Sequence, residues 1–219
     1  EKYEELTQSL FIDMFGDPFT NLKGFPVVSI SSFGSVITGN TPSRQIAQNY
    51  GDHIEWIKSD NITSTHNYIT TAKEFLSAKG ASVGRVVPTG SMLVTCIAGS
   101  RNSIGNVALT DRSVAFNQQI NALVPYDPAD TYFLFQQLYL NKELVREQSS
   151  GGMKGLVNKT NFSSIKLLDP PEQIKAEYNR KFQRLNLLAE QFKNSDTIIN
   201  ELFNSLQHKA FSGELSGAA

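Results

Sequence analysis

The sequence predicts an α+β protein, in which a globular domain with an irregular, mostly antiparallel sheet precedes a long α-helix of the coiled-coil type. Two patterns support this class. Short β-like runs alternate with Gly, Asn, Ser and Thr turns over residues 21–168, and an unbroken seven-residue apolar repeat follows residue 169. The 219 residues are 40% hydrophobic and include 14 Phe, which is enough for one cored domain plus an extension.

The composition also limits the possible functions. A formal net charge of −1 argues against a free-standing protein that clamps nucleic acid by charge alone, so partners of a DNA-binding chain would have to supply much of the phosphate attraction. The single cysteine, Cys96, excludes an internal disulfide framework and predicts a cytoplasmic protein. No apolar run approaches the ~18 residues of a membrane span, so we expect no membrane partner.

Residues 1–20 are predicted to form an N-terminal helix that is the tail of a preceding region. Apolar side chains recur at helical spacing between Tyr3 and Phe15, and Gly16-Asp17-Pro18 ends the pattern. The same phrase returns near the other end of the chain. Each of these five residues recurs 196 positions later: Glu5, Leu6, Ser9, Leu10 and Phe15. This echo indicates one unit of a two-fold arrangement that still carries the end of the preceding unit.

Residues 21–168 are predicted to form the globular domain. Its expected strands are Val27–Ile30, Ile54–Ile57, Met92–Ile97, Val107–Leu109 and Ile120–Val124. One helix is expected within it, opened by Asp127-Pro128, continuing through Val145 and closed by the Ser-Ser-Gly-Gly segment 149–152.

Residues 169–219 are predicted to form a spacer helix that pairs with an antiparallel helix. Asp169-Pro170-Pro171-Glu172 has the residues of a helix start. A 4-3-4-3 spacing then continues to Ala210, and Asp196 is its one polar member. Some forty residues make a rod of roughly 60 Å, which is too long to bury its whole seam on one domain. The predicted seam residues are Tyr178, Phe182, Leu185, Phe192, Ile199, Phe203 and Leu206. The alternative is a long helix packed on its own domain.

Several short sequence motifs, taken in order along the chain, resemble those of a known family. They are Ser9–Pro18, Gly39–Ser43, Ile54–Ile62, Asn117–Gln119, Gly151–Val157 and Asp169–Gln173. Together they resemble the DNA-specificity subunit of type I restriction–modification systems. The last phrase is a shortened form of the family's closing signature, because Glu172 follows the two prolines directly.

The resemblance implies a non-catalytic subunit whose target-recognition domain, residues 21–168, reads one half of a split double-stranded DNA target. It also implies methyltransferase (modification) subunits that carry S-adenosylmethionine, motor-nuclease (restriction) subunits, and no cofactor in this chain. The chain then corresponds either to the second half of a full subunit or to a half-length form that makes a homodimer. The echoed termini favour both equally.

Polar loops supply the candidate DNA contacts, because Arg, Lys, Asn, Gln and Ser side chains read base edges or hold phosphates. The predicted base-reading residues are Arg44 and Gln45 in one loop, Lys58, Ser59 and Asn61 in a second, and Arg101 and Asn102 in a third. Lys154 and Lys159 are better suited to phosphate. Trp56 is predicted to belong to the core or to support the loop beside it, and Asn117–Gln119 is predicted to contact either DNA or the domain's own backbone.

Two other classes of function remain open. The chain could be a coiled-coil adaptor whose globular domain binds protein and does not read DNA. It could also be an amino-methyltransferase fragment, because Asp169-Pro170-Pro171 resembles a motif of those enzymes, although Glu172 stands where they need an aromatic ring. His53, His66 and His208 lie far apart and lack metal-ligand spacing.

Overall fold

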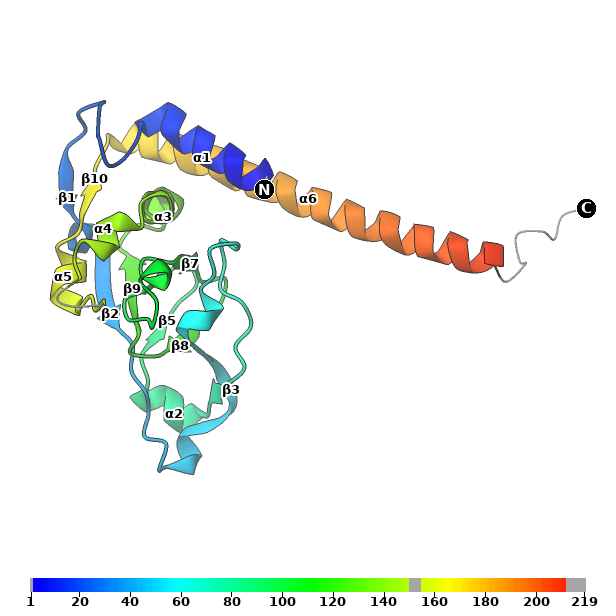
Figure 1. Cartoon of the computed structure of the whole chain (residues 1–219), viewed down its shortest axis with the longest axis horizontal. Coiled ribbons are helices and arrows are strands. Elements are labelled where there is room, and N and C mark those ends of the chain that lie inside the picture. The colour runs from blue at the N-terminus through cyan, green and yellow to red at the C-terminus, as the bar shows by residue number, and fades with distance from the viewer. Residues whose placement is uncertain (1, 150–154, 212–219) are drawn as a thin grey trace, which may run out of the picture.

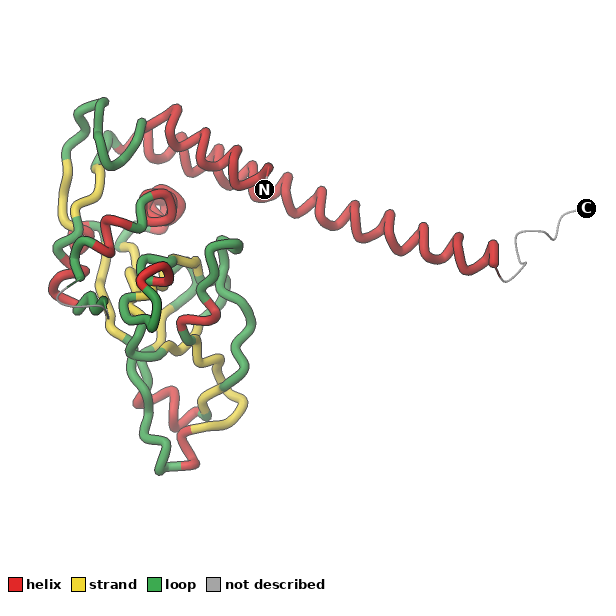
Figure 2. The backbone as a smooth tube through the Cα atoms, in the orientation of Figure 1, coloured by secondary structure: helices red, strands yellow, loops and turns green. Residues whose placement is uncertain are grey.

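The structure, a computed structural model, describes residues 2–149 and 155–211. A globular head carries one long helix, α6, that projects far beyond it, and helix α1 lies along the first half of α6 (Figure 1). Loops make up most of the head at the end remote from α6 (Figure 2). The predicted fold class, an α+β head followed by a long helix, is confirmed.

The elements in chain order are α1 (Lys2–Phe15), β1 (Val27–Ser29), β2 (Gly34–Thr38), β3 (Tyr50–Ile57), β4 (Phe75–Leu76), α2 (Ala78–Val83), β5 (Val86–Val87), β6 (Met92–Thr95), β7 (Val107–Leu109), β8 (Val114–Phe116), β9 (Ile120–Pro125), α3 (Thr131–Leu140), α4 (Glu143–Arg146), α5 (Lys159–Ser163), β10 (Lys166–Leu168) and α6 (Glu172–Phe211). Each of the five predicted strands is present, and β2, β4, β5, β8 and β10 were not predicted.

The strands form two four-stranded sheets and one two-stranded ribbon. The first sheet has the order β2-β9-β6-β7 and is antiparallel throughout; the second has the order β4-β3-β8-β5, in which only the β3–β8 pair is parallel; β1 and β10 make the ribbon. The first sheet is buried on both faces. Met92 and Val94 of β6 pack in the core shared with the helices, and Leu93 between them packs in the core shared with the second sheet. Neighbouring residues therefore point to opposite faces, as the two-residue period of a strand requires.

The prediction of one continuous helix from Asp127 to Val145 is wrong. A short 3-10 turn, Pro128–Asp130, precedes α3, and the chain breaks at Asn141 and Lys142 before α4. The break is stabilised by tertiary hydrogen bonds. Arg146 of α4 donates to the carbonyl oxygens of Ile104 (3.0 Å) and Asn102 (2.9 Å), which a straight continuation of α3 would not bring within reach.

Helices α1 and α6 run antiparallel and meet through aromatic side chains (Figure 1). The ring of Phe11 lies 5.6 Å from that of Tyr178, and the Tyr3 hydroxyl, eight residues earlier on α1, bonds Asn186, eight residues later on α6. Phe15 lies 4.8 Å from Phe133 of α3 and 5.3 Å from Tyr178. This aromatic cluster joins α1, α3 and the start of α6 into one core.

The predicted seam of α6 is therefore divided. Tyr178 and Phe182 are fully buried within the chain, and Leu185 is half-buried. Phe192, Ile199, Phe203 and Leu206 lie beyond α1 and are 56–70% exposed. The alternative, packing on its own domain, therefore holds for the first half of the helix, and pairing of the second half with another helix stays a prediction. That second half presents an uncovered apolar seam.

A buried ion cluster attaches the first turn of α6 to the head. The Lys175 ammonium lies 2.9 Å from carboxylate oxygens of both Asp130 and Glu172, and 3.8 Å from Asp169. Burial raises the pKa of the Asp130 carboxyl. Burial also opposes the charge of Lys175, but hydrogen bonds to Glu172 and Asp130 outweigh it and raise the pKa of the ammonium. The cluster therefore helps to set the direction in which α6 leaves the head.

Candidate nucleic-acid interface

Several polar loops meet along one edge of the head. The Thr41 hydroxyl, after β2, donates to the side chain of Gln118, after β8. The Ser59 hydroxyl, after β3, lies 3.3 Å from Oε1 of Gln119. We call this edge the loop rim, and define it as residues 40–46, 58–61, 96–103, 117–119 and 155–160.

Backbone contacts extend the loop rim to its last two segments. The carbonyl oxygen of Gln119 accepts hydrogen bonds from the N–H groups of Cys96 (2.8 Å) and Ile97 (3.0 Å). Ile97 in turn forms an antiparallel bridge with Leu156. The loops that carry Arg44 and Lys58, and the segment that leads to Arg101, are therefore linked through residues 117–119, although up to 57 residues separate them along the chain.

Asn117 is the internal support of this edge. Its Oδ1 accepts from the Gln119 N–H (3.1 Å), its Nδ2 donates to Gln119 Oε1 (2.9 Å), and its backbone N–H donates to the Ile57 carbonyl (3.0 Å). Of the two roles predicted for 117–119, this geometry shows hydrogen bonding within the domain for Asn117. Gln118 is exposed beside Thr41.

Arg44 and Lys58 are brought together by one carboxylate that the sequence prediction missed. Glu74 accepts a hydrogen bond from Nη2 of Arg44 at 2.7 Å and another from the Lys58 ammonium. The hydrogen bond from Lys58 is the main reason that the pKa of the Glu74 carboxyl is lowered; the bond from Arg44 adds to it, and burial partly opposes it. Glu74 is therefore ionised at neutral pH, and the three side chains carry a net charge of +1. We call them the Arg44 cluster.

The rings of Tyr50 and Trp56 pack against the Arg44 cluster. The Arg44 guanidinium carbon lies 4.8 Å from the ring centre of Tyr50 and 5.3 Å from that of Trp56, and the Lys58 ammonium lies 5.0 Å from the Trp56 ring. Trp56 is 3% exposed and packs in a core cluster, so of its two predicted roles the place in the core is confirmed.

The same aromatic residues hold the loop that carries Arg44. The Tyr50 hydroxyl donates to the Pro42 carbonyl (2.7 Å), and the Trp56 indole N–H donates to the Asn40 carbonyl (3.3 Å). These bonds anchor the loop to β3. The loop lies at the end of the head that is farthest from α6 (Figure 1).

The remaining predicted contacts have different surroundings. Asn61 is buried, and its side chain bonds the Lys58 N–H (3.0 Å) and the Thr71 carbonyl (3.0 Å), so it supports its own loop and is not presented at the surface. Gln45 is exposed next to Arg44. Arg101 and Asn102 form an exposed turn held against α4, with Arg101 3.9 Å from Glu143. Lys159 is exposed in the first turn of α5. Lys154 lies outside the described residues.

No local signal could have identified Glu74 as a partner of Arg44, because 30 residues separate them. Antiparallel pairing of β4 with β3 brings Glu74 beside Trp56, whose backbone N–H donates to the Glu74 carbonyl (3.0 Å). The contact therefore depends on strand pairing, which the composition of the loops does not reveal.

The charge of the chain is unevenly distributed. Residues 21–168 contain 13 Lys and Arg against nine Asp and Glu, so the head carries a net charge of +4, whereas the rest of the chain carries −5. The overall value of −1 conceals this difference. The total charge of −1 argued against binding of phosphates by this chain. Because the head alone is basic, that argument does not apply to the head.

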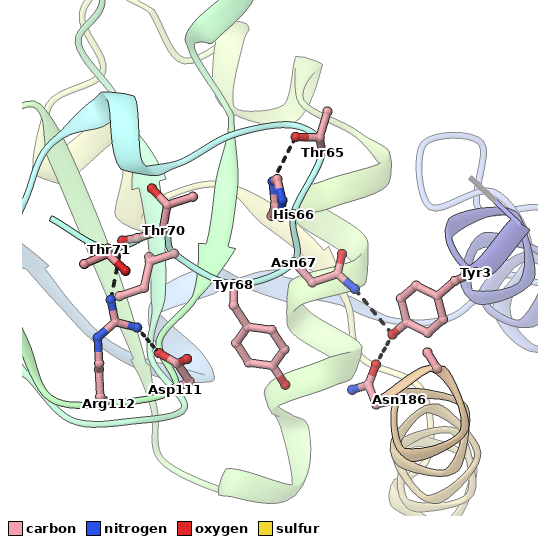
Figure 3. Close-up of a pocket in the computed structure, with 12 residues that line it drawn as sticks. Tyr3, Thr65, His66, Asn67, Tyr68, Thr70, Thr71, Asp111, Arg112 and Asn186 are labelled. Atoms are coloured by element: carbon pink, nitrogen blue, oxygen red, sulfur yellow. Dashed lines mark hydrogen bonds and ion pairs between the residues drawn. The ribbon is translucent and has the colours of Figure 1, made fainter. Parts of the chain in front are cut away.

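A groove of about 570 Å³ opens between the head and the paired helices (Figure 3). Tyr3 of α1 and Asn186 of α6 form one wall, and Asn67, Asp111 and Arg112 of the head belong to the other. Asn67 Nδ2 reaches the Tyr3 hydroxyl at 3.4 Å across the groove. None of the described DNA-contact candidates lines it, so this groove and the loop rim are separate features.

The described residues contain no group of three or more His, Cys, Asp and Glu side chains arranged to hold a metal ion. Among the described helices, none is long and apolar enough to cross a membrane.

The described residues share their overall arrangement, a head carried on a long helix, with solved specificity subunits of restriction systems. The structure aligns with the HsdS subunit from Thermoanaerobacter tengcongensis with a TM-score of 0.61 at 16% identity, covering 97% of this chain and 51% of that one. It aligns with the type I restriction–modification S subunit from M. genitalium with a TM-score of 0.61 at 10% identity, covering 93% and 52%. These likenesses establish the fold.

Sequence comparison identifies the family. The profile of the type I restriction modification DNA specificity domain matches residues 23–202. The chain is 32% identical over 167 residues to the type I restriction enzyme HindI specificity subunit of Haemophilus influenzae, covering 73% of the chain and 35% of that protein. It is 29% identical over 136 residues to the MjaIX specificity subunit of Methanocaldococcus jannaschii, covering 59% and 30%. The chain therefore belongs to the type I restriction modification DNA specificity domain family, and it spans about a third of the length of these curated relatives.

Proposed function

We propose that this chain reads one half-site of a split duplex DNA target as part of a type I specificity subunit. The observation that carries the proposal is the loop rim, which joins Arg44 and Lys58 through Glu74 and carries the exposed Arg101 in a linked segment, on a basic head in a chain of this family. Exposed cations and amide side chains are the groups that read base edges and hold phosphates. A protein-binding adaptor would not require them on one edge.

The second half of α6 is proposed to pair with the corresponding helix of another unit, either a second copy or the other half of a full subunit. Residues 197–211 echo 1–15, and α1 shows how such a segment packs. Phe15 of α1 is buried against Phe133 and Tyr178, whereas its counterpart Phe211 is 85% exposed. The end of α6 would therefore cover the neighbouring unit's spacer helix as α1 covers this one, with both heads related by a two-fold axis.

The remaining expectations follow from this role. The chain itself is proposed to be non-catalytic and to act in the cytoplasm. Methyltransferase subunits would dock on it and bind S-adenosylmethionine, and motor-nuclease subunits would complete the assembly.

Duplex binding as a function of salt concentration tests the proposal on the complex with the modification subunits. We expect a preference for one target sequence and a linear fall of log K with log salt concentration, because phosphate contacts release counterions. The Lys159→Ala variant should lower the slope by about one unit, because Lys159 is the exposed cation predicted to contact a phosphate. A complex that assembles fully but binds no duplex would instead support the adaptor.

The long helix is predicted to set the distance between half-sites. Inserting seven residues at Asp196, with a matching insertion in the opposing helix, lengthens the rod by about 10 Å and keeps the seam in phase. We expect the preferred spacer between half-sites to grow by about three base pairs while the bases of each half-site stay the same. A two-residue insertion is the matched control, because it rotates the two ends of the seam by about 200° relative to each other and should weaken assembly. Selection of altered half-site bases would contradict the prediction.

A further inference from the structure

We infer that Arg44 reads a guanine in the major groove and that Glu74 is the residue that positions it, an inference that rests on the proposed function. The two side chains and Lys58 form one hydrogen-bonded unit, and the loop that carries Arg44 lies at the end of the head farthest from α6 (Figure 1). Arg44 is 57% exposed along its side chain, so a duplex that approaches this end meets it directly.

The arrangement limits the freedom of Arg44 before any DNA binds. Glu74 bonds its Nη2, and the rings of Tyr50 and Trp56 lie 4.8 and 5.3 Å from the guanidinium carbon. A long side chain that is already held loses less conformational entropy on binding, and a fixed guanidinium presents its donors in one direction. Contacts of this kind favour sequence discrimination over general attraction.

Glu74 also disfavours the alternative role, a phosphate contact. Its carboxylate is ionised and touches both cations, so an approaching phosphate would be repelled by a negative charge beside the two positive ones. The edge of a base is neutral and does not suffer this repulsion. A carboxylate that bridges Arg44 and Lys58 therefore suits a site for base edges.

The donor pattern then selects the base. A guanidinium carries five N–H donors and no acceptor, and Glu74 is its only hydrogen-bond partner among the described residues, through Nη2 alone. Guanine presents two acceptors, O6 and N7, on its major-groove edge, whereas adenine presents one acceptor and one donor, and cytosine one donor. Only guanine accepts two hydrogen bonds from such a fork.

The test is selection of methylated duplexes from a library with randomised half-sites, performed with the complete complex of this chain and its modification subunits. The wild-type complex should select a half-site with a guanine at one position. Arg44→Ala should reduce that preference roughly 5- to 150-fold while leaving the other positions unchanged. Glu74→Gln keeps the shape and removes the charge, so it should relax the same position and strengthen binding to unrelated sequences. Lys79→Ala, an exposed cation on the neighbouring helix α2, is the control and should leave the selected half-site unchanged.

The outcomes separate the two proposals. A wild-type complex that selects no sequence refutes DNA reading by this chain, and the Arg44 assignment with it. A selective wild-type complex whose guanine preference survives Arg44→Ala, or one in which Arg44→Ala weakens all sequences equally, overturns only the Arg44 assignment. Unchanged selection by Glu74→Gln would remove Glu74 as the positioning residue.

Discussion

Replacing Lys175 with alanine is expected to lower the free energy of unfolding by about 3 kcal/mol, because removing one partner of a buried ion pair leaves the other charge uncompensated. The Lys175 side chain is 7% exposed and the Asp130 side chain 10%. Without the ammonium, the Asp130 carboxylate would stay buried near Glu172, whose negative charge already disfavours its ionisation. The expected loss is at the lower end of the usual range because Glu172 is itself more than half exposed.

Urea denaturation of the chain measures this change. Lys181→Ala is the matched control, since Lys181 lies on the same helix and pairs with Glu177 at 2.8 Å, but both side chains are 50% exposed. Exposed i,i+4 pairs contribute little to stability because solvent screens them, so the control should hardly change the midpoint. Adding Asp130→Asn to Lys175→Ala should recover part of the loss, because it removes the unpaired charge. Equal losses for Lys175→Ala and Lys181→Ala would show that the buried cluster does not stabilise the junction.

Replacing Phe182 with alanine is expected to destabilise the chain by about 3–5 kcal/mol, the usual loss when a fully buried aromatic side chain leaves a cavity. Phe182 is 0% exposed, and its ring lies 4.8 Å from Tyr132 and 5.7 Å from Tyr178. The substitution therefore removes contacts with both α3 and the aromatic cluster.

Phe192→Ala provides the contrast on the same seam. Phe192 is 70% exposed, so at dilutions where the chain is monomeric its loss should change the free energy of unfolding by no more than about 0.5 kcal/mol. Phe192→Ala should instead weaken association more than Phe182→Ala does, because Phe192 belongs to the uncovered seam that we propose pairs with another unit. Sedimentation of each variant, alone and with the modification subunits, measures this. If both substitutions destabilise the monomer equally, the division of the seam is wrong.

Local patterns were sufficient to predict the secondary elements that obey one period. The five predicted strands, the helix α1 and the long helix α6 all exist, because alternation and heptad spacing are properties of neighbouring residues. The prediction of one helix from Asp127 to Val145 was wrong because its break depends on residues that are distant in sequence. Its break at Asn141 and Lys142 is stabilised by bonds from Arg146 to carbonyl groups more than 40 residues away, which no local pattern contains.

In the candidate site, too, features set by neighbouring residues could be predicted and features set by distant residues could not. Loop composition identified Arg44, Lys58 and Arg101 as exposed or partly exposed polar residues. It also proposed Asn61, which is buried and serves its own loop, because burial depends on how the segment 70–71 packs over it. Glu74 escaped prediction because only the pairing of β4 with β3 brings it to Arg44.

Three features can be predicted from the order of the residues alone, because they are patterns of residue identity along the chain: the heptad seam, the echo between the two ends, and the family to which the chain belongs. The tertiary structure alone decided where the seam is covered and where it is open, and which cations stand around one carboxylate. The physical reason is that burial and charge pairing are set by side chains distant in sequence. Tyr178 is buried because Phe11 and Phe15 fold back onto it, whereas Phe192, at an equivalent position of the same repeat, has no such neighbour among the described residues.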